Sequence, residues 1–179
     1  MKELKKYIQD RLKDELKVIR QGYASVLPEL SVEEKTLIYW YTDSGSMGLN
    51  ELLKESKGKK ISKLGEYLDI ALSKLPNFEG ITFRGDNLSS YEIAKYQQAL
   101  DSEITIIDPT FVSSSRLKNK ANEYRRTVMF EIFSKNGKHI EKVSKFVNEQ
   151  EVLFRRNSQF WVLDIEKRDS YVYIILQEI

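Results

Sequence analysis

The residues best suited to chemistry in this sequence begin with two carboxylates that are two positions apart. Glu149 and Glu151 flank Gln150 where a loop is expected to enter a strand. Alternation along a strand would place both carboxylates on one face, where like charges repel and a purely structural strand gains little. One carboxylate could stabilise positive charge at an anomeric carbon during glycosidic cleavage, and the other could orient a nucleophile. A solvated acidic pair at the mouth of a strand is the structural alternative.

An arginine and a serine run could complete such a site. Arg84 is expected to end the strand that starts at Ile81, with Gly85 after it. A guanidinium there can hold a diphosphate by bidentate hydrogen bonds, and a glycine lets a ligand approach the backbone closely. The hydroxyl groups of the run Ser113–Ser115 could orient a carboxylate. The structural alternatives are a surface salt bridge beside a turn glycine, and a polar strand end or helix cap.

Composition excludes several other chemistries. The 179 residues carry a formal net charge of +2, from 29 basic and 27 acidic side chains, which gives no electrostatic case for nucleic acid or an anionic membrane as partner. The absence of cysteine excludes disulfides and thiolate catalysis. The single histidine, His139, excludes a multi-histidine metal site and makes a serine-histidine triad a poor hypothesis. We interpret His139 as an exposed turn residue.

The elements that must position these residues change character along the chain. Apolar spacing predicts helices over 4–19, from a capping box at Ser31 and Glu34 through 41, and over 49–53, 64–75 and 91–100. Strands are predicted over 81–84, 103–107, 110–113, 127–133, 151–154, 160–165 and 171–176, with a loop at 42–46 and a turn at Asn136-Gly137. Helices first and strands afterwards indicate an α+β fold. We predict one domain over 1–179, with a helical part to about residue 78 and a β-rich core from about residue 79.

The motifs together resemble the Arg-Ser-Glu class of mono-ADP-ribosyltransferases, which includes the clostridial binary-toxin actin modifiers. The matching segments cover roughly residues 30 to 165: Ser31 to Thr42 with Asn50 and Leu53, Leu68 to Gly85, the Phe111–Ser115 strand, and Gly137, Ile140, Ser144 and Phe146 before Glu149–Phe154. One departure is Ser114, where the family usually has threonine. The resemblance implies two β-sheets packed around an NAD cleft, with flanking helices.

The resemblance also implies a role for each principal residue. Arg84 would hold the NAD diphosphate, and Gly85 would offer backbone groups to the nicotinamide carboxamide. Ser113 would position both the catalytic glutamate and the nicotinamide ribose. Glu151 would be that catalytic glutamate, which bonds the ribose 2′-hydroxyl while nicotinamide leaves. Glu149 would bind the target arginine and thereby direct the enzyme to arginine.

Further residues match the family less specifically. Arg126 resembles a second phosphate-contacting arginine, with Arg125 and Arg116 as competitors. Phe146 resembles the aromatic residue of the target-recognition loop, although it could equally anchor that loop in the core. Tyr41 and Asn50 are expected to line the nucleotide side of the cleft, and helix packing is the alternative role for both.

The predicted function is therefore transfer of ADP-ribose from NAD to an arginine of a target protein, without a metal. An NAD glycohydrolase and a non-catalytic binding module of the same fold remain open as alternatives. Actin, a GTPase or a bacterial host protein could be the target. No signal peptide or transmembrane helix is recognised in the sequence. A cytosolic protein, one exported by another route and a piece of a longer toxin all remain open.

Overall fold

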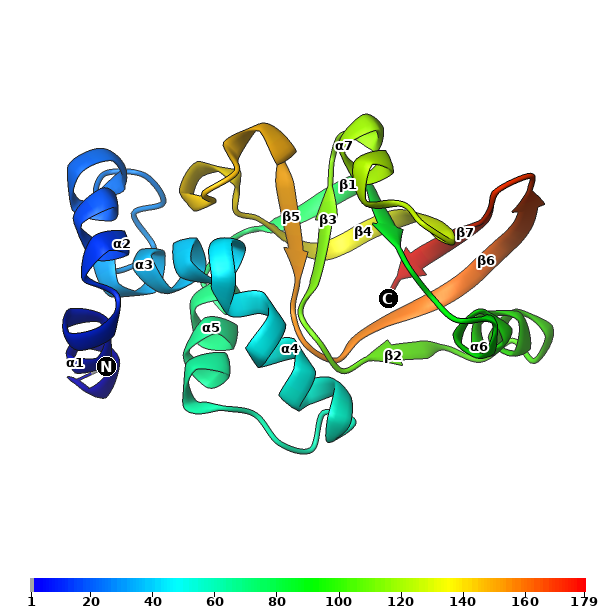
Figure 1. The fold of residues 1–179 in the computed structure, drawn as a ribbon, viewed down its shortest axis with the longest axis horizontal. Helices are drawn as coiled ribbons and strands as arrows, with labels where there is room; N and C mark the ends of the chain where they lie inside the picture. The colour runs from blue at the N-terminus through cyan, green and yellow to red at the C-terminus, as the bar shows by residue number, and fades with distance from the viewer. Residues whose placement is uncertain (1) are drawn as a thin grey trace.

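The computed structural model describes residues 2–179, and its first part is a group of short helices (Figure 1). In chain order these are α1 (Lys2–Arg11), α2 (Lys13–Val18), the π-helix η1 (Ile19–Tyr23), α3 (Val32–Trp40), the π-helix η2 (Tyr41–Gly45), α4 (Ser46–Glu55) and α5 (Lys63–Ser73). The helix predicted over 4–19 is divided at Leu12, whose backbone is not helical. The capping box is confirmed, because Ser31 and Glu34 bond each other's backbone reciprocally.

The prediction of a loop at 42–46 is wrong, because the chain continues from α3 through η2 into α4 without leaving helical geometry. The Thr42 hydroxyl donates to the carbonyl of Tyr39 inside this segment. A side chain at Gly45 would come within 2.5 Å of the Trp40 ring. The glycine therefore lets the widened turn pack against Trp40, and its presence does not mark a loop.

The second part of the chain carries all seven strands and two more α-helices. These are β1 (Asn77–Asp86), α6 (Ser90–Asp101), β2 (Ile106–Asp108), β3 (Val112–Ser115), α7 (Lys118–Tyr124), β4 (Val128–His139), the 3-10 turns η3 (Glu141–Val143) and η4 (Val147–Glu149), β5 (Glu151–Phe154), β6 (Ser158–Arg168) and β7 (Tyr171–Glu178). The order of helices followed by strands confirms the α+β class. Helix α7 was not predicted from the sequence.

The strands are joined by hydrogen bonds into one continuous sheet in the order β1-β3-β5-β4-β7-β6-β2. The 12-residue strand β4 explains this connection, because it pairs with β1 along most of its length, with β7 over its first half and with β5 at its far end. β1 also pairs with β3, and β3 pairs with β5, so the pairings β1-β3-β5-β4-β1 close on themselves. Figure 1 shows that β3 and β5 cross β1 and β4, while β7, β6 and β2 extend to one side.

Two local predictions within the strands are also wrong. β1 does not end at Arg84 but continues to Asp86, because β4 pairs with it as far as Val128. No turn forms at Asn136-Gly137, which lies inside β4. A side chain at Gly137 would come within 2.7 Å of Val152, so this glycine serves the close packing of β4 on β5. His139 is consequently a half-buried strand residue, 3.0 Å from Glu141, and not an exposed turn residue.

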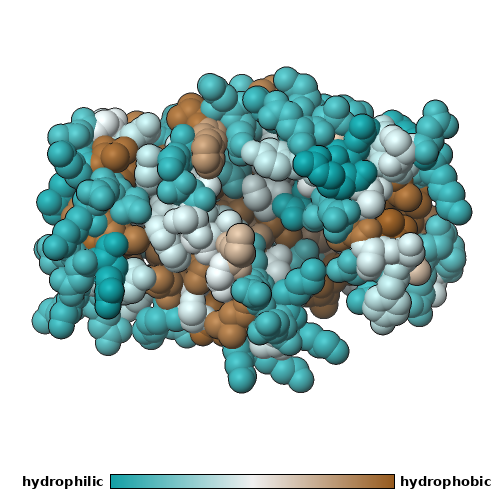
Figure 2. Space-filling view, viewed as in Figure 1, coloured by the Kyte–Doolittle hydropathy of each residue, from teal (hydrophilic) through white to brown (hydrophobic). Residues whose placement is uncertain are grey.

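Two large apolar clusters hold these parts together. One joins the N-terminal helices to β5 and the loop before it, and it includes Leu37, Leu68 and Leu72 together with Ile140 and Leu153. The other fills the space between α6 and the sheet. Figure 2 shows mostly hydrophilic side chains on one face, with scattered apolar patches between them. Within residues 2–179, no helix is both long and apolar enough to cross a lipid bilayer.

Candidate active site

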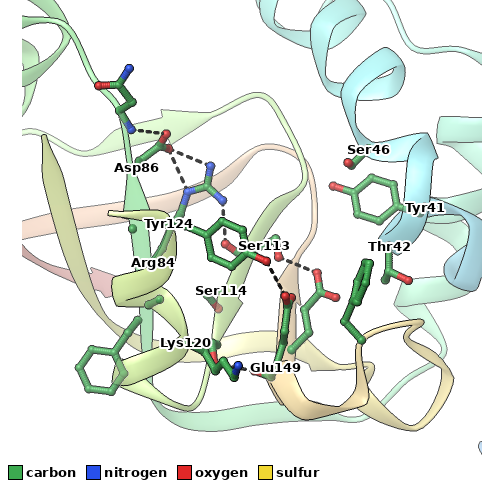
Figure 3. A pocket seen from close by; sticks show the side chains of 17 residues that line it. Tyr41, Thr42, Ser46, Arg84, Asp86, Ser113, Ser114, Lys120, Tyr124 and Glu149 are labelled. Carbon is green, nitrogen blue, oxygen red and sulfur yellow. Dashed lines mark hydrogen bonds and ion pairs between the residues drawn. The ribbon is translucent and has the colours of Figure 1, made fainter. Parts of the chain in front are cut away.

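A cleft of about 410 Å³ brings together the residues that the sequence singled out (Figure 3). Its walls come from η2, β1, β3, α7 and the segment from Phe146 to Glu151. The predicted site residues that line it are Tyr41, Arg84, Gly85, Ser113, Phe146, Glu149 and Glu151. Side chains that are far apart in the chain are therefore collected at one place by the pairing of β1 with β3 and of β3 with β5.

Glu151 lies at the floor of this cleft as the first residue of β5. Only 4% of its surface is exposed. The Ser113 hydroxyl donates to its Oε1 at 2.6 Å, and the Ser144 hydroxyl lies 3.4 Å from its Oε2. The strand register explains the first contact, because Ser113 and Glu151 lie on neighbouring, hydrogen-bonded strands. The predicted role of Ser113 in orienting a carboxylate agrees with this contact.

The buried environment changes the acidity of Glu151. Burial, followed by the negative charge of Glu149, raises the pKa of Glu151 to about 7. Hydrogen bonds from Ser113 and Ser144, together with the charge of Arg84, act in the opposite direction. Desolvation destabilises an ionised carboxylate unless its neighbours compensate fully. A carboxyl group that changes charge near neutral pH, within a cleft, is typical of a catalytic position.

Glu149 reaches the same cleft by a different route from the one expected. It lies in the 3-10 turn η4, outside the strand, and Gln150 adopts a left-handed backbone conformation with φ 46°. The alternation of side chains along a strand is therefore not what places the two carboxylates together. The Ser115 hydroxyl donates to the Glu149 carbonyl at 2.5 Å, and the Tyr124 hydroxyl donates to its Oε1 at 2.5 Å. Glu149 is thus fixed at both its backbone and its carboxylate.

Arg84 projects from β1 toward the centre of a longer groove. Its Nη1 donates to the carbonyl of Ser113 at 2.8 Å, and its Nε and Nη2 both donate to Oδ2 of Asp86 at 3.1 and 2.8 Å. A second cavity of about 420 Å³ lies on the other side of this ion pair. Arg84, Asp86 and Asn87 line both cavities, so the guanidinium lies where they meet.

Gly85 has a packing role that the sequence did not reveal. A side chain there would come within 2.2 Å of the Ala121 carbonyl oxygen and 2.4 Å of the Arg125 backbone nitrogen. The glycine is therefore required for α7 to lie directly against β1. It also lines the cleft, so this packing role and the predicted contact with nicotinamide are compatible.

Tyr41 and Asn50 connect the helices to the strand that carries Ser113. The Asn50 amide donates to the Phe111 carbonyl at 3.0 Å and accepts from the Phe111 backbone nitrogen at 3.0 Å. The same amide donates to the Tyr41 hydroxyl, which itself donates to the Phe111 carbonyl at 3.2 Å. Tyr41 lines the first cavity and Asn50 the second. Their hydrogen bonds favour the helix-packing role, while their positions remain compatible with the nucleotide side.

Phe146 lies at the cleft with 44% of its surface exposed, which favours recognition over the role of core anchor. Arg126 is placed differently, because it is exposed, donates to the carbonyls of Glu123 and Arg125, and is not among the cleft-lining residues. Its competitors are also engaged elsewhere: Arg125 stacks on Tyr171, and Arg116 lies 3.3 Å from His139. A phosphate contact by Arg126 stays a prediction.

Three polar residues of the site were not singled out from the sequence as functional residues: Asp86, Tyr124 and Ser144. Asp86 follows Arg84 by two positions, and this spacing in a strand could have indicated the contact. Tyr124 gave no comparable signal, because it belongs to a short polar helix whose formation was not predicted. The contact of Ser144 with Glu151 depends on the path of a loop, and neither strand alternation nor helical periodicity predicts that path.

Comparisons with known proteins give a consistent result. The model of the ADP-ribosyltransferase exoenzyme family matches residues 11–179. The protein named NAD(+)–arginine ADP-ribosyltransferase Mav, of Mycobacterium avium, is 29% identical over 139 residues, and Vis, of Vibrio splendidus, is 26% identical over 163 residues. These matches cover 76% and 81% of this chain but only 16% and 64% of the two relatives. The structure of exoenzyme S from Pseudomonas aeruginosa superposes with a TM-score of 0.79 at 17% identity, covering 99% of this chain and 88% of that one.

Proposed function

Because the chain belongs to the ADP-ribosyltransferase exoenzyme family, we propose that it transfers ADP-ribose from NAD to an arginine side chain of a protein and releases nicotinamide. The observation that carries this proposal is the difference between two carboxylates in one cleft. Glu151 is buried and bonded to Ser113, which suits bond cleavage, whereas Glu149 lies nearer the surface in a turn, which suits contact with an incoming side chain.

The shape of the groove supports NAD as the donor. A dinucleotide consists of two nucleoside halves joined by a diphosphate, and here two cavities of similar volume meet at Arg84. The guanidinium of Arg84 would hold the diphosphate by charge-assisted hydrogen bonds, after sharing or releasing its contact with Asp86. The nicotinamide half then belongs in the cavity that contains Glu151. The structure of exoenzyme S, which contains Carba-NAD, is consistent with this choice of ligand.

The residues of the cleft would share the reaction as follows. Glu151, oriented by Ser113, bonds the ribose and stabilises positive charge at the anomeric carbon while the bond to nicotinamide breaks. Nicotinamide carries a positive charge in NAD, so it leaves as a neutral molecule with the bonding electrons and needs no acid. A guanidinium nitrogen of the acceptor then bonds the anomeric carbon. Glu149 holds that guanidinium, which is charged at neutral pH, and accepts the proton that it must lose.

Two substitutions separate transfer from NAD hydrolysis. We expect Glu149→Ala to lower transfer to agmatine, a small guanidinium compound that occupies the Vis structure, at least a hundredfold while NAD hydrolysis persists. We expect Glu151→Ala to abolish both reactions. Labelled NAD allows both products to be measured in one assay. Equal loss of the two activities in a folded Glu149→Ala protein would contradict the division of roles, and hydrolysis without any transfer by the wild type would favour the glycohydrolase.

The protein partner is proposed by chemistry only: a protein with an exposed arginine whose side chain reaches Glu149. Actin and GTPases remain candidates from the resemblance. Phe146 would contact the surface around that arginine, and Tyr41 and Asn50 would lie on the nucleotide side. Incubation with labelled NAD and cell lysate, followed by mapping of the modified residue, would identify the target. Modification at a side chain other than arginine would contradict the proposed acceptor.

A further inference from the structure

The helix α7 contributes to the cleft one aromatic side chain that lies outside the apolar core. Tyr124 is its last residue, and 56% of its surface is exposed. Its ring does not belong to any of the three apolar clusters of residues 2–179. Its hydroxyl nevertheless donates a 2.5 Å hydrogen bond to Oε1 of Glu149, which Figure 3 shows across the mouth of the cleft.

The position of Tyr124 is set by the strand that carries Arg84. Gly85 leaves the space into which the Ala121 carbonyl of α7 fits, and Ala121 itself is 3% exposed. The Lys118 ammonium at the start of α7 donates to the Tyr173 hydroxyl at 2.9 Å. The helix is therefore fixed on the sheet at both its first turn and its middle. An exposed tyrosine on such a helix loses little conformational freedom when it holds a partner.

The contact leaves Glu149 ready for a cation. Its carbonyl accepts from Ser115 and its Oε1 accepts from Tyr124, so its Oε2 remains available to an incoming guanidinium. The hydrogen bond with Glu149 is the largest cause that raises the pKa of Tyr124 to about 12. The phenol therefore keeps its proton at neutral pH and acts as a donor. A neutral donor can orient a carboxylate without cancelling the charge that attracts an arginine.

We propose that Tyr124 is a positioning residue for the acceptor: through its hydroxyl it holds the Glu149 carboxylate in the geometry that receives the arginine guanidinium. The proposal rests on the proposed transfer to arginine. Tyr124 acts through Glu149 and has no part in the cleavage of NAD. Preorganisation of this kind lowers the entropy that is lost when the acceptor is bound in a reactive geometry.

The test compares Tyr124→Phe with the wild type in transfer to agmatine and in NAD hydrolysis. The substitution removes only the hydroxyl, and we expect kcat/KM for agmatine to fall roughly ten- to a hundredfold, as for loss of a hydrogen bond to a charged group. The KM for NAD and the rate of hydrolysis should stay within about twofold of wild type, because Ser113 and Glu151 are untouched. Tyr91→Phe is the matched control, since Tyr91 is 73% exposed and lines neither cavity of the groove; it should change nothing.

Two results would overturn the proposal. One is wild-type kcat/KM for agmatine in Tyr124→Phe. The other is an equal fall in transfer and hydrolysis with an unchanged melting temperature, which would place Tyr124 in NAD cleavage. A second variant, Glu149→Gln with and without Tyr124→Phe, sharpens the answer: the tyrosine substitution should have little further effect once the carboxylate is gone. Absence of transfer by the wild type would instead contradict the proposed function.

Discussion

The two carboxylates of the cleft are two residues apart, yet they occupy opposite environments. Glu151 begins β5, is 4% exposed, and faces the hydroxyls of Ser113 and Ser144. Glu149 lies in a 3-10 turn, and its partner Tyr124 is 56% exposed. The left-handed residue between them, Gln150, turns the chain from the one environment into the other.

These two environments would suit two different steps of the proposed reaction, the cleavage of NAD and the binding of the acceptor arginine. Burial at Glu151 makes ionisation unfavourable and raises its pKa to about 7, and the charge of the ionised form is little screened by solvent where positive charge would develop. The nearer position of Glu149, held by a side chain of α7, suits an acceptor that arrives from solvent.

The largest effect is expected for Glu151→Gln. The amide keeps the size of the side chain and can still accept the hydrogen bond of Ser113, but it has no negative charge. We expect both transfer and NAD hydrolysis to fall about a thousandfold or more. Rate measurements with labelled NAD would check this, and retention of either activity above one tenth of wild type would contradict the assignment of Glu151 to cleavage.

The same substitution should stabilise the protein at neutral pH. The pKa of Glu151 is about 7 in the folded state against 4.5 for an ordinary glutamate carboxyl, so the folded state binds the proton more tightly. The free energy of unfolding therefore loses up to about 3 kcal/mol as the pH rises from about 4.5 to about 7. The Glu151→Gln protein does not lose this stability, because the amide does not ionise. Thermal unfolding should show a higher melting temperature than wild type at pH 8, with a smaller difference at pH 4.

A smaller effect on the same half of the site is expected for Ser113→Ala. Its hydrogen bond lowers the pKa of Glu151, so its removal raises that pKa above 7 and reduces the ionised fraction at pH 7. We expect both activities to fall roughly tenfold at pH 7 and to recover partly at pH 9. Ser114→Ala is the control, because that hydroxyl bonds the Val152 carbonyl instead. An unchanged pH profile in Ser113→Ala would show that the hydrogen bond does not govern ionisation.

The buried half of the site was largely predictable from the sequence. Arg84, Ser113 and Glu151 lie in short motifs that resemble those of the family, and the pairing of β1 with β3 and of β3 with β5 then brings these residues together. The boundaries were less accurate, because pairing with β4 extends β1 beyond Arg84 to Asp86. Strand termini depend on the partner strand, which local sequence does not contain.

The exposed half was predictable only in part. The placement of Glu149 was expected from strand alternation, but it results from the left-handed Gln150 and the bond from Ser115. Helix α7 carries few apolar residues and depends on Gly85 for its seat on β1, a tertiary contact. Similarly, Gly45 and Gly137 indicate turns when the sequence is considered alone. In the fold, their lack of a side chain allows the close approach of Trp40 and Val152. Glycine patterns alone cannot distinguish these uses.

Asn50→Ala tests whether the nucleotide side depends on packing between helix and strand. The substitution removes two hydrogen bonds to the Phe111 backbone and one to Tyr41. We expect the free energy of unfolding to fall by about 1–3 kcal/mol, which lowers the melting temperature by roughly 2–4 °C per kcal/mol. Glu55→Ala is the control, because Glu55 is an exposed residue of the same helix and lines neither cavity of the groove. A raised KM for NAD with an unchanged melting temperature would instead indicate direct contact with the nucleotide.

The smallest effect is expected where the loop that carries Lys145 and Phe146 contacts η2. The Lys145 ammonium lies 2.6 Å from Oδ1 of Asp43, and its backbone nitrogen donates to the Thr42 hydroxyl. The Lys145 side chain is 40% exposed, so solvent screens the pair and Lys145→Met should leave the melting temperature almost unchanged. NAD hydrolysis should be unchanged, because Glu151 has no contact with this pair. Only the KM for a protein acceptor should rise, about two- to threefold, since Phe146 would lose part of its support.

Asp43→Asn should give the same result, and the double variant should be no worse than either single one. A larger effect on hydrolysis than on transfer would show that the loop supports the buried half of the site as well.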